Sequence, residues 1–200
     1  MTNLVRLDRR GATAAEFALV LPLLLLFILG MLDAGRYLWE INKLEKATQM
    51  GARLAVVTTP VSTGLSGMDY VNSGGLTQGD IIPASALSPV ICSRTACTCT
   101  PNCPTNYQVT DPAAFDRIVA RIRAMKPDIT ASNVQVIYRG SGLGYAGDPA
   151  GMDVSPLVSV ELSNVQFLPV TGMFFGGVQF KLPMFRTTLT AEDSVGKESN

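Results

Sequence analysis

The first quarter of the chain is dominated by one long apolar run. No charged residue lies between Phe17 and Leu32, and counting back to Ala12 gives 21 residues. An α-helix needs about 20 residues to cross the hydrocarbon core of a bilayer. The pattern therefore predicts a membrane-spanning helix over residues 12–32. Pro22 removes one backbone donor inside this helix, which favours a kink there.

The apolar pattern continues beyond the span, but on one side only. Apolar and small residues recur at three- and four-residue steps: Tyr37, Ile41, Leu44, Thr48, Ala52 and Ala55. This period is typical of an amphipathic helix, so residues 33–59 are predicted to extend the span as an amphipathic stalk. Thr59 precedes Pro60, and the residue before a proline disfavours helical geometry. We therefore expect one continuous helix over residues 12–57. Its expected helix-packing residues are Pro22, Tyr37, Ile41 and Leu44.

Basic residues flank the span on both sides in equal number: Arg6, Arg9 and Arg10 before it, and Arg36, Lys43 and Lys46 after it. The denser N-terminal cluster favours a cytoplasmic N-terminus and an extracytoplasmic C-terminal domain. Two alternatives remain open, a cleaved secretory signal peptide and a simple uncleaved anchor. The apolar run is longer than the usual signal-peptide core, and no clear A-x-A-like cleavage site follows it.

Residues 60–111 are rich in Gly, Ser, Thr, Pro and Asn, and we expect an irregular segment held by its cysteines. The four cysteines, Cys92, Cys97, Cys99 and Cys103, are spaced C-x4-C-x-C-x3-C. Since a Cys97–Cys99 bond would close a very tight loop, two pairings are preferred. They are Cys92–Cys97 with Cys99–Cys103, or Cys92–Cys99 with Cys97–Cys103. Zinc is the alternative, but zinc sites usually separate their cysteine pairs by a longer loop, so no metal is expected. Disulfides agree with an oxidising compartment.

Residues 112–200 are predicted to form an α+β domain with an antiparallel, pilin-like sheet. Asp111 and Pro112 are typical of a helix start, and Pro127 is expected to stop that helix. Alternating apolar residues predict strands at 134–138, 154–162 and 185–189. The uncharged stretch from Leu162 to Phe180 carries too many Gly, Pro, Asn and Gln residues for a second span. We expect a strand and an apolar loop tip there, and an exposed tip would be a candidate contact for a membrane or a partner.

Composition and charge narrow the possible functions. The chain contains no histidine, which excludes Ser-His-Asp and Cys-His catalysis and histidine metal ligands. The formal net charge is zero, so binding of nucleic acid has little support. The carboxylate pairs Asp148 with Asp153 and Asp111 with Asp116 are the remaining catalytic candidates. No nucleophile and base accompany them, so we expect neither an enzyme nor a cofactor.

The N-terminal end of the span carries an acidic residue, Glu16, five residues after Gly11 and behind a basic tail. A carboxylate is costly in a membrane and usually has a partner there. A basic tail, a glycine, small residues, a glutamate and an apolar helix are together the arrangement of a prepilin-type leader, here residues 1–11.

The chain also resembles a known family. Residues 10–22, RGATAAEFALVLP, look like the N-terminus of the TadE-like pseudopilins of tight-adherence (Tad, Flp-type) pilus systems. Gly35-Arg36-Tyr37, then Leu44, Ala47 and residues 51–55, are similar to the part of that family that follows the membrane helix. The chain departs from the pattern at Asp33-Ala34, where a bulkier apolar or aromatic residue is expected, and at Lys46-Ala47-Thr48, where an alanine pair is commoner.

The resemblance implies a minor pseudopilin with a structural role in assembling such a pilus or secretion apparatus. It implies cleavage between Gly11 and Ala12 by a prepilin peptidase at the bacterial inner membrane. It also implies that the charge of Glu16 meets the new N-terminal amine of an adjacent pilin or pseudopilin. The competing hypothesis is a single-pass, membrane-anchored extracytoplasmic binding module unrelated to pili.

Overall fold

The computed structural model describes residues 9–149 and 152–191. The chain divides into two compact units. The first comprises residues 1–40 and 166–180, and the second comprises residues 41–165 and 181–200. Together they form an α+β protein, as predicted.

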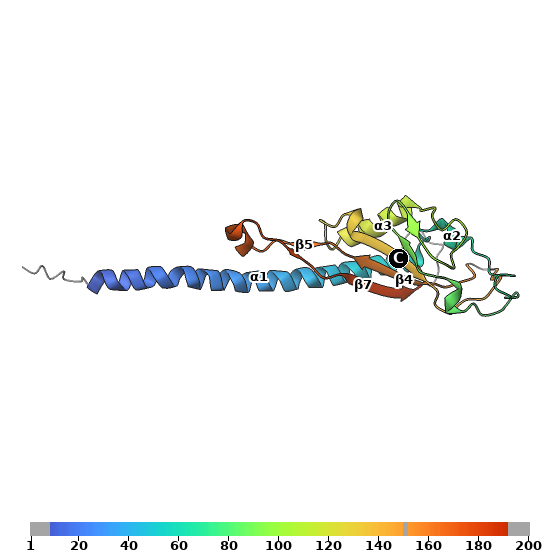
Figure 1. The fold of residues 1–200 in the computed structure, drawn as a ribbon, viewed down its shortest axis with the longest axis horizontal. Coiled ribbons are helices and arrows are strands. Elements are labelled where there is room, and N and C mark those ends of the chain that lie inside the picture. Colours follow the sequence, from blue (N-terminus) through green and yellow to red (C-terminus); the bar gives the residue numbers. More distant parts are fainter. Residues whose placement is uncertain (1–8, 150–151, 192–200) are drawn as a thin grey trace, which may run out of the picture. The chain divides into compact units, whose positions relative to one another are not determined.

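Helix α1 (Arg9–Val57, 49 residues) is the longest element and belongs to both units (Figure 1). It runs continuously through Pro22, which lies inside the helix without ending it. It ends at Val57, directly before Thr58, Thr59 and Pro60, because the proline restricts the residue before it. The predicted continuous helix over residues 12–57 is therefore confirmed.

The first unit pairs the N-terminal part of α1 with a short β-ribbon. Strands β5 (Gln166–Phe167) and β6 (Phe180–Lys181) form a two-stranded sheet. The 3-10 helix η3 (Thr171–Phe175) lies between them, and Gly176 and Gly177 follow it with φ of 77° and 79°. These left-handed angles favour glycine and let the chain turn back. The expected strand with an apolar loop tip is thus present.

The second unit contains a five-stranded sheet in the order β2-β1-β3-β4-β7, antiparallel throughout. Its strands are β1 (Val90–Cys92), β2 (Cys97–Thr98), β3 (Val134–Arg139), β4 (Leu157–Leu162) and β7 (Phe185–Thr190). The predicted strands correspond to β3, β4 and β7. Strand β4 begins later than expected, because Val154 forms an isolated bridge with Gly144 and Pro156 lacks a backbone donor.

The core of the second unit forms between the end of α1, helix α3 (Pro112–Arg123) and the sheet. Its fully buried side chains include Leu44, Ala52, Phe115, Ile122 and Val160. Gly51 of α1 allows a close approach: a Cβ atom at that position would lie 2.8 Å from Cγ1 of Ile122 and 3.4 Å from Cγ1 of Val160. The glycine therefore lets α1 pack closely against α3 and β4 in this core.

Residues 60–111 differ in part from the irregular segment that the sequence predicts. Besides turns, they contain the short helix α2 (Thr63–Ser66) and the 3-10 helix η1 (Ala84–Ala86). Outside this segment, the 3-10 helix η2 (Ala131–Asn133) directly precedes β3. The cysteine-containing part forms β1 and β2, which join the main sheet. Strands of three and two residues are too short to show alternation in sequence.

Candidate functional site

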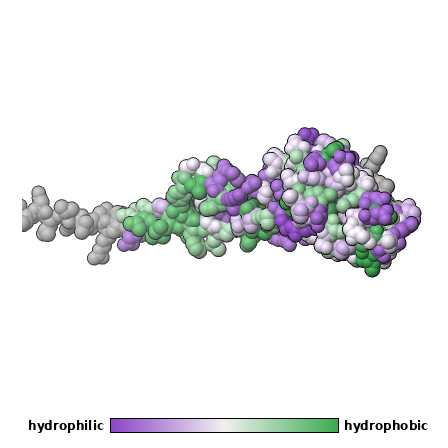
Figure 2. All heavy atoms as spheres, turned by 45° about the vertical axis from the view of Figure 1, so that its right-hand side comes forward, coloured by the Kyte–Doolittle hydropathy of each residue, from purple (hydrophilic) through white to green (hydrophobic). Residues whose placement is uncertain are grey.

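The surface of α1 between Phe17 and Leu32 is apolar and largely uncovered. Every large apolar side chain from Phe17 to Leu32 is exposed, except that of Leu29, which is half-buried. Figure 2 shows hydrophobic residues gathered along this part of the helix. In the described part of the chain, α1 is the one helix long and apolar enough to cross a membrane. It is compatible with a single-pass membrane anchor.

The residues of the predicted processing site lie at the start of the same helix. Gly11 and Ala12 fall within its first turns, where the structure describes the backbone only. Glu16 follows on the described surface and is exposed. Ala12 and Glu16 are four residues apart, so they lie on the same face of α1, one turn from each other. The arrangement places a carboxylate near the position where a cleaved chain would begin.

The four predicted helix-packing residues have different surroundings. Leu44 is fully buried in the second unit, and Ile41 is half-buried. Tyr37 packs edge-on against Phe167 of the ribbon, with ring centroids 5.5 Å apart. Pro22 is exposed within the apolar part of α1. Three of the four therefore pack within their own chain, whereas Pro22 is part of the uncovered surface.

Asp33 forms a contact that the sequence did not predict. Its carboxylate accepts hydrogen bonds from the backbone N–H groups of Val170 at 2.7 Å and Thr171 at 2.8 Å, and from the Thr171 hydroxyl at 2.6 Å. The guanidinium of Arg36 lies 3.2 Å from the same carboxylate. We call this set of contacts the Asp33 clasp. It fixes the base of the apolar loop to α1 directly after the predicted span.

A second contact lies one turn further along the helix. Phe167 of β5 contacts Tyr37, and the Arg36 guanidinium lies over its ring at 5.5 Å from the centroid. Edge-on aromatic pairs contribute about 0.5–1.5 kcal/mol, and exposed cation–π pairs contribute about 0.5–1 kcal/mol. The ribbon is therefore held to α1 at two successive levels. The only sequence signal for this was the departure from the family pattern at Asp33.

The cysteines form one of the two preferred pairings. Cys92 bonds to Cys97, and Cys99 bonds to Cys103. Cys92 and Cys97 also face each other in the register of β1 and β2. No group of His, Cys, Asp or Glu side chains within the described residues is arranged to hold a metal ion. The cysteines act here as covalent links within the sheet and the loop after it.

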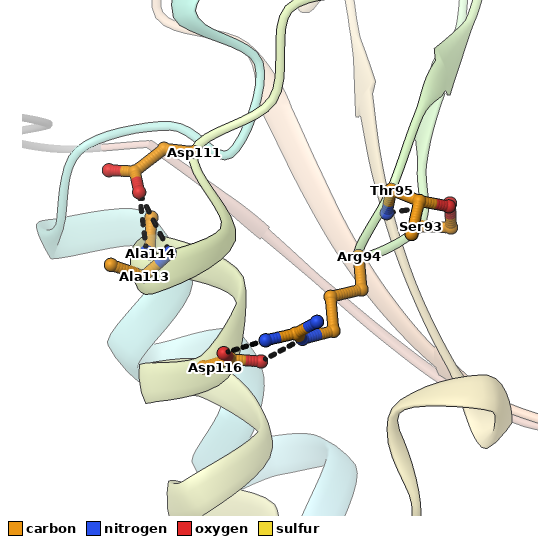
Figure 3. Close-up of polar contacts among 7 residues, drawn as sticks. All are labelled: Ser93, Arg94, Thr95, Asp111, Ala113, Ala114 and Asp116. Atoms are coloured by element: carbon orange, nitrogen blue, oxygen red, sulfur yellow. Dashed lines mark hydrogen bonds and ion pairs between the residues drawn. The ribbon is translucent and has the colours of Figure 1, made fainter.

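The first carboxylate pair, Asp111 and Asp116, is engaged in structural contacts (Figure 3). Asp111 caps helix α3 by accepting hydrogen bonds from Ala113 N at 2.8 Å and Ala114 N at 3.1 Å. Asp116 binds the guanidinium of Arg94 through both oxygens, each at 2.8 Å. These hydrogen bonds from Arg94 lower the pKa of the Asp116 carboxyl. The two carboxylates serve a helix end and a surface ion pair.

The second pair, Asp148 and Asp153, organises a loop. The buried Asp153 carboxylate accepts hydrogen bonds from Tyr70 N at 2.7 Å and Asp148 N at 3.0 Å. Burial, together with the nearby Asp153 charge, raises the pKa of Tyr70 to about 12. Asp153 thus joins the loop around Tyr70 to the loop that contains Asp148. Both of its carboxylate oxygens accept hydrogen bonds from backbone N–H groups.

Comparison with known proteins identifies one region of the chain. Neither a curated protein nor a solved structure matches the chain. The family model of TadE-like proteins matches residues 11–53. The match starts at the predicted processing glycine, contains Glu16 and the clasp residue Asp33, and ends near the end of α1. Helix α1 therefore carries the signature of the TadE-like proteins, the family that the sequence resembles.

Proposed function

We propose that this protein is a minor pseudopilin that acts structurally in the assembly of a Tad/Flp-type pilus or secretion apparatus. The observation that carries the proposal is the position of the family match. It covers residues 11–53, and so falls on the one described helix that is long and apolar enough to cross a membrane, whose apolar stretch between Phe17 and Leu32 is left exposed by the rest of the chain. An uncovered apolar helix of this kind fits a role in packing within a membrane or a helical assembly.

Maturation is the first step of this proposal. A prepilin peptidase at the inner membrane cleaves after Gly11 and leaves a chain that begins with the positive amine of Ala12. Glu16 of one subunit then pairs with the amine of its neighbour. Both charges are costly in an apolar environment, and their pairing relieves that cost. The exposure of Glu16 on α1 supports this role, because the carboxylate is accessible to another molecule.

The same proposal sets the location and the partners. The protein spans the bacterial inner membrane once, with its N-terminus in the cytoplasm and its sheet domain in the periplasm. The two disulfides support this orientation, because they persist in an oxidising compartment. The partners are the prepilin peptidase, other pilins or pseudopilins, and the assembly machinery.

The decisive experiment measures the intact mass and N-terminal sequence of the protein purified from its host. We expect a mature chain that begins at Ala12. A Gly11→Leu variant should remain unprocessed. Gly30→Leu is the matched control, because it places the same side chain on the same helix where no other atom lies within 4 Å. That control should be processed normally.

Two outcomes would contradict the proposal. Retention of residues 1–11 on the wild-type protein would indicate a plain membrane anchor, and cleavage after Ala34 would indicate a secreted protein. Either result would favour an extracytoplasmic binding module unrelated to pili.

A second experiment tests the assembly role of Glu16. Glu16→Ala should abolish or strongly reduce pilus formation or secretion while leaving the protein in the membrane. Glu45→Ala is the control, because it removes another exposed carboxylate further along α1. An unchanged pilus phenotype with Glu16→Ala would favour the binding-module hypothesis instead.

A further inference from the structure

The loop between β5 and β6 ends in an exposed apolar surface for which the proposed function gives no role. We call residues 171–178 the apolar tip. Met173, Phe174 and Phe175 lie in succession and are 73%, 68% and 63% exposed, and Val178 follows at 47%. No charged residue occurs between Leu162 and Phe180. An apolar cluster of this kind on a protruding loop marks a contact site, because water disfavours it.

The direction of the ribbon along α1 follows from its two contacts with the helix. Phe167 contacts Arg36 and Tyr37, whereas Val170 and Thr171 bind Asp33. From residue 167 to residue 171 the loop therefore moves towards the N-terminus of α1, by about 6 Å for four helical residues. The apolar tip follows directly from Thr171, and Figure 1 shows η3 beside the middle of α1.

That direction leads towards the predicted membrane span. Asp33 is the first residue after the span 12–32, so the Asp33 clasp lies at its end. Beyond it come Arg36, Tyr37 and Trp39, residue types that are enriched at the membrane–water interface. The Asp33 clasp thus lies at the boundary between the predicted span and these interfacial residues, and the apolar tip begins at this boundary.

The backbone of the apolar tip also suits a membrane surface. Gly172 N donates to Pro169 O at 3.1 Å, Met173 N to Val170 O at 3.2 Å, and Gly177 N to Gly172 O at 2.8 Å. These internal hydrogen bonds lower the cost of removing the turn from water. Large apolar side chains on such a surface are stabilised when they enter the boundary between headgroups and acyl chains.

We propose that the apolar tip inserts into the membrane leaflet beside its own helix and gives the protein a second, interfacial attachment. The occupant of this surface is the phospholipid bilayer that α1 crosses. The inference rests on the membrane-anchored part of the proposed function and is independent of pilus assembly. It assigns the Asp33 clasp a role, which is to hold the tip at the depth of the leaflet.

Tryptophan fluorescence in proteoliposomes tests this proposal. Trp39 is the single tryptophan, so in a Trp39→Phe background each variant carries one tryptophan at a chosen position. Phe174→Trp reports on the apolar tip and Phe27→Trp on the span. Tyr145→Trp is the aqueous control, because Tyr145 is exposed in the second unit. Each full-length variant is reconstituted in phosphatidylcholine with either ordinary or brominated acyl chains, since bromine quenches tryptophan on contact.

The expected result is strong quenching of the reporters at 27 and 174 by brominated lipid, with no quenching at 145. Quenching at 27 without quenching at 174 would overturn the inference and leave the membrane anchor intact. An unquenched reporter at 174 whose emission shifts to the blue as the protein-to-lipid ratio rises would show contact between copies of the chain, and would also overturn it. Absence of quenching at 27 would overturn both the anchor and the tip proposal.

Discussion

Asp33 accepts hydrogen bonds from both the backbone N–H and the hydroxyl of Thr171, a residue 138 positions later in the chain. A buried carboxylate such as that of Asp33 is costly unless its oxygens have hydrogen-bond partners. Here the partner is the base of the apolar loop. The contact converts a costly residue into the point where the ribbon attaches to α1.

The Asp33 clasp predicts the mobility of the ribbon. Asp33→Ala leaves three donors on Val170 and Thr171 without their acceptor, so amide hydrogen exchange across residues 166–180 should accelerate. Thr171→Val is the matched control, because it removes the hydroxyl donor and keeps the two backbone hydrogen bonds. Its effect should be smaller. Equal exchange in the wild type and in Asp33→Ala would show that the clasp does not hold the loop.

Substitutions of Asp111 and Asp116 should lower the free energy of unfolding by different amounts. Asp111→Ala removes the cap of α3 and should lower the free energy of unfolding by about 1 kcal/mol, whereas Asp111→Asn, which also caps well, should change little. Asp116→Ala breaks an ion pair whose side chains are about half exposed, and should cost less than about 1 kcal/mol. Urea denaturation of the full chain in detergent measures all three. A larger loss for Asp116→Ala than for Asp111→Ala would contradict this assignment.

Gly51 should tolerate no larger side chain. Gly51→Leu would drive a side chain into the space of the buried Ile122 and should cost about 1–3 kcal/mol. Gly35→Leu places the same residue on the same helix where nothing lies within 4 Å. It should be neutral or slightly stabilising, because leucine favours a helix over glycine by somewhat less than about 1 kcal/mol. Thermal unfolding distinguishes the two; equal midpoints would argue against close packing at Gly51.

Two buried tyrosines predict a loss of stability at high pH. Burial raises the pKa of Tyr138 above its ordinary value, and burial with the Asp153 charge raises that of Tyr70 to about 12. Above about pH 10 the unfolded chain releases these protons and the folded chain retains them, so the free energy of unfolding falls as pH rises. For Tyr70 the loss extends from about pH 10 to about pH 12.

Variants separate the contribution of each tyrosine to this pH dependence. Tyr138→Phe and Tyr70→Phe should each flatten the decline in stability between pH 10 and pH 12, measured by denaturation at a series of pH values. Tyr138→Phe should also lower stability at neutral pH by about 1–3 kcal/mol, because Val61 N loses its 2.8 Å hydrogen bond to the Tyr138 oxygen. The exposed Tyr145→Phe is the control. An unchanged slope in both buried variants would contradict the prediction.

The sequence predicted the elements whose signals are local. The end of α1 followed from the proline after Thr59, the start of α3 from Asp111 and Pro112, and the strand β3 from alternation. The N-terminal signature was recognised from the residues around Gly11 and Glu16, and the family match covers it.

The elements that the sequence did not predict depend on distant contacts. Strands β1 and β2 pair with each other, and β1 also pairs with β3, more than forty residues later in the chain. Asp33 was noted only as a departure from the family pattern, because nothing near it in sequence identifies Thr171 as its partner. Spacing also left the cysteines with two acceptable pairings, and the register of β1 with β2 corresponds to one of them.

The disulfides have a consequence for the order in which the chain matures. Cys92 and Cys97 are five residues apart, and Cys99 and Cys103 are four apart. Each pair therefore needs only its own short stretch of chain in order to meet. If the C-terminal part is translocated as proposed, both bonds can close while β3, β4 and β7 are still on the other side of the membrane. The hairpin of β1 and β2, closed by a disulfide, would then form first, and β3 could pair with its exposed edge afterwards.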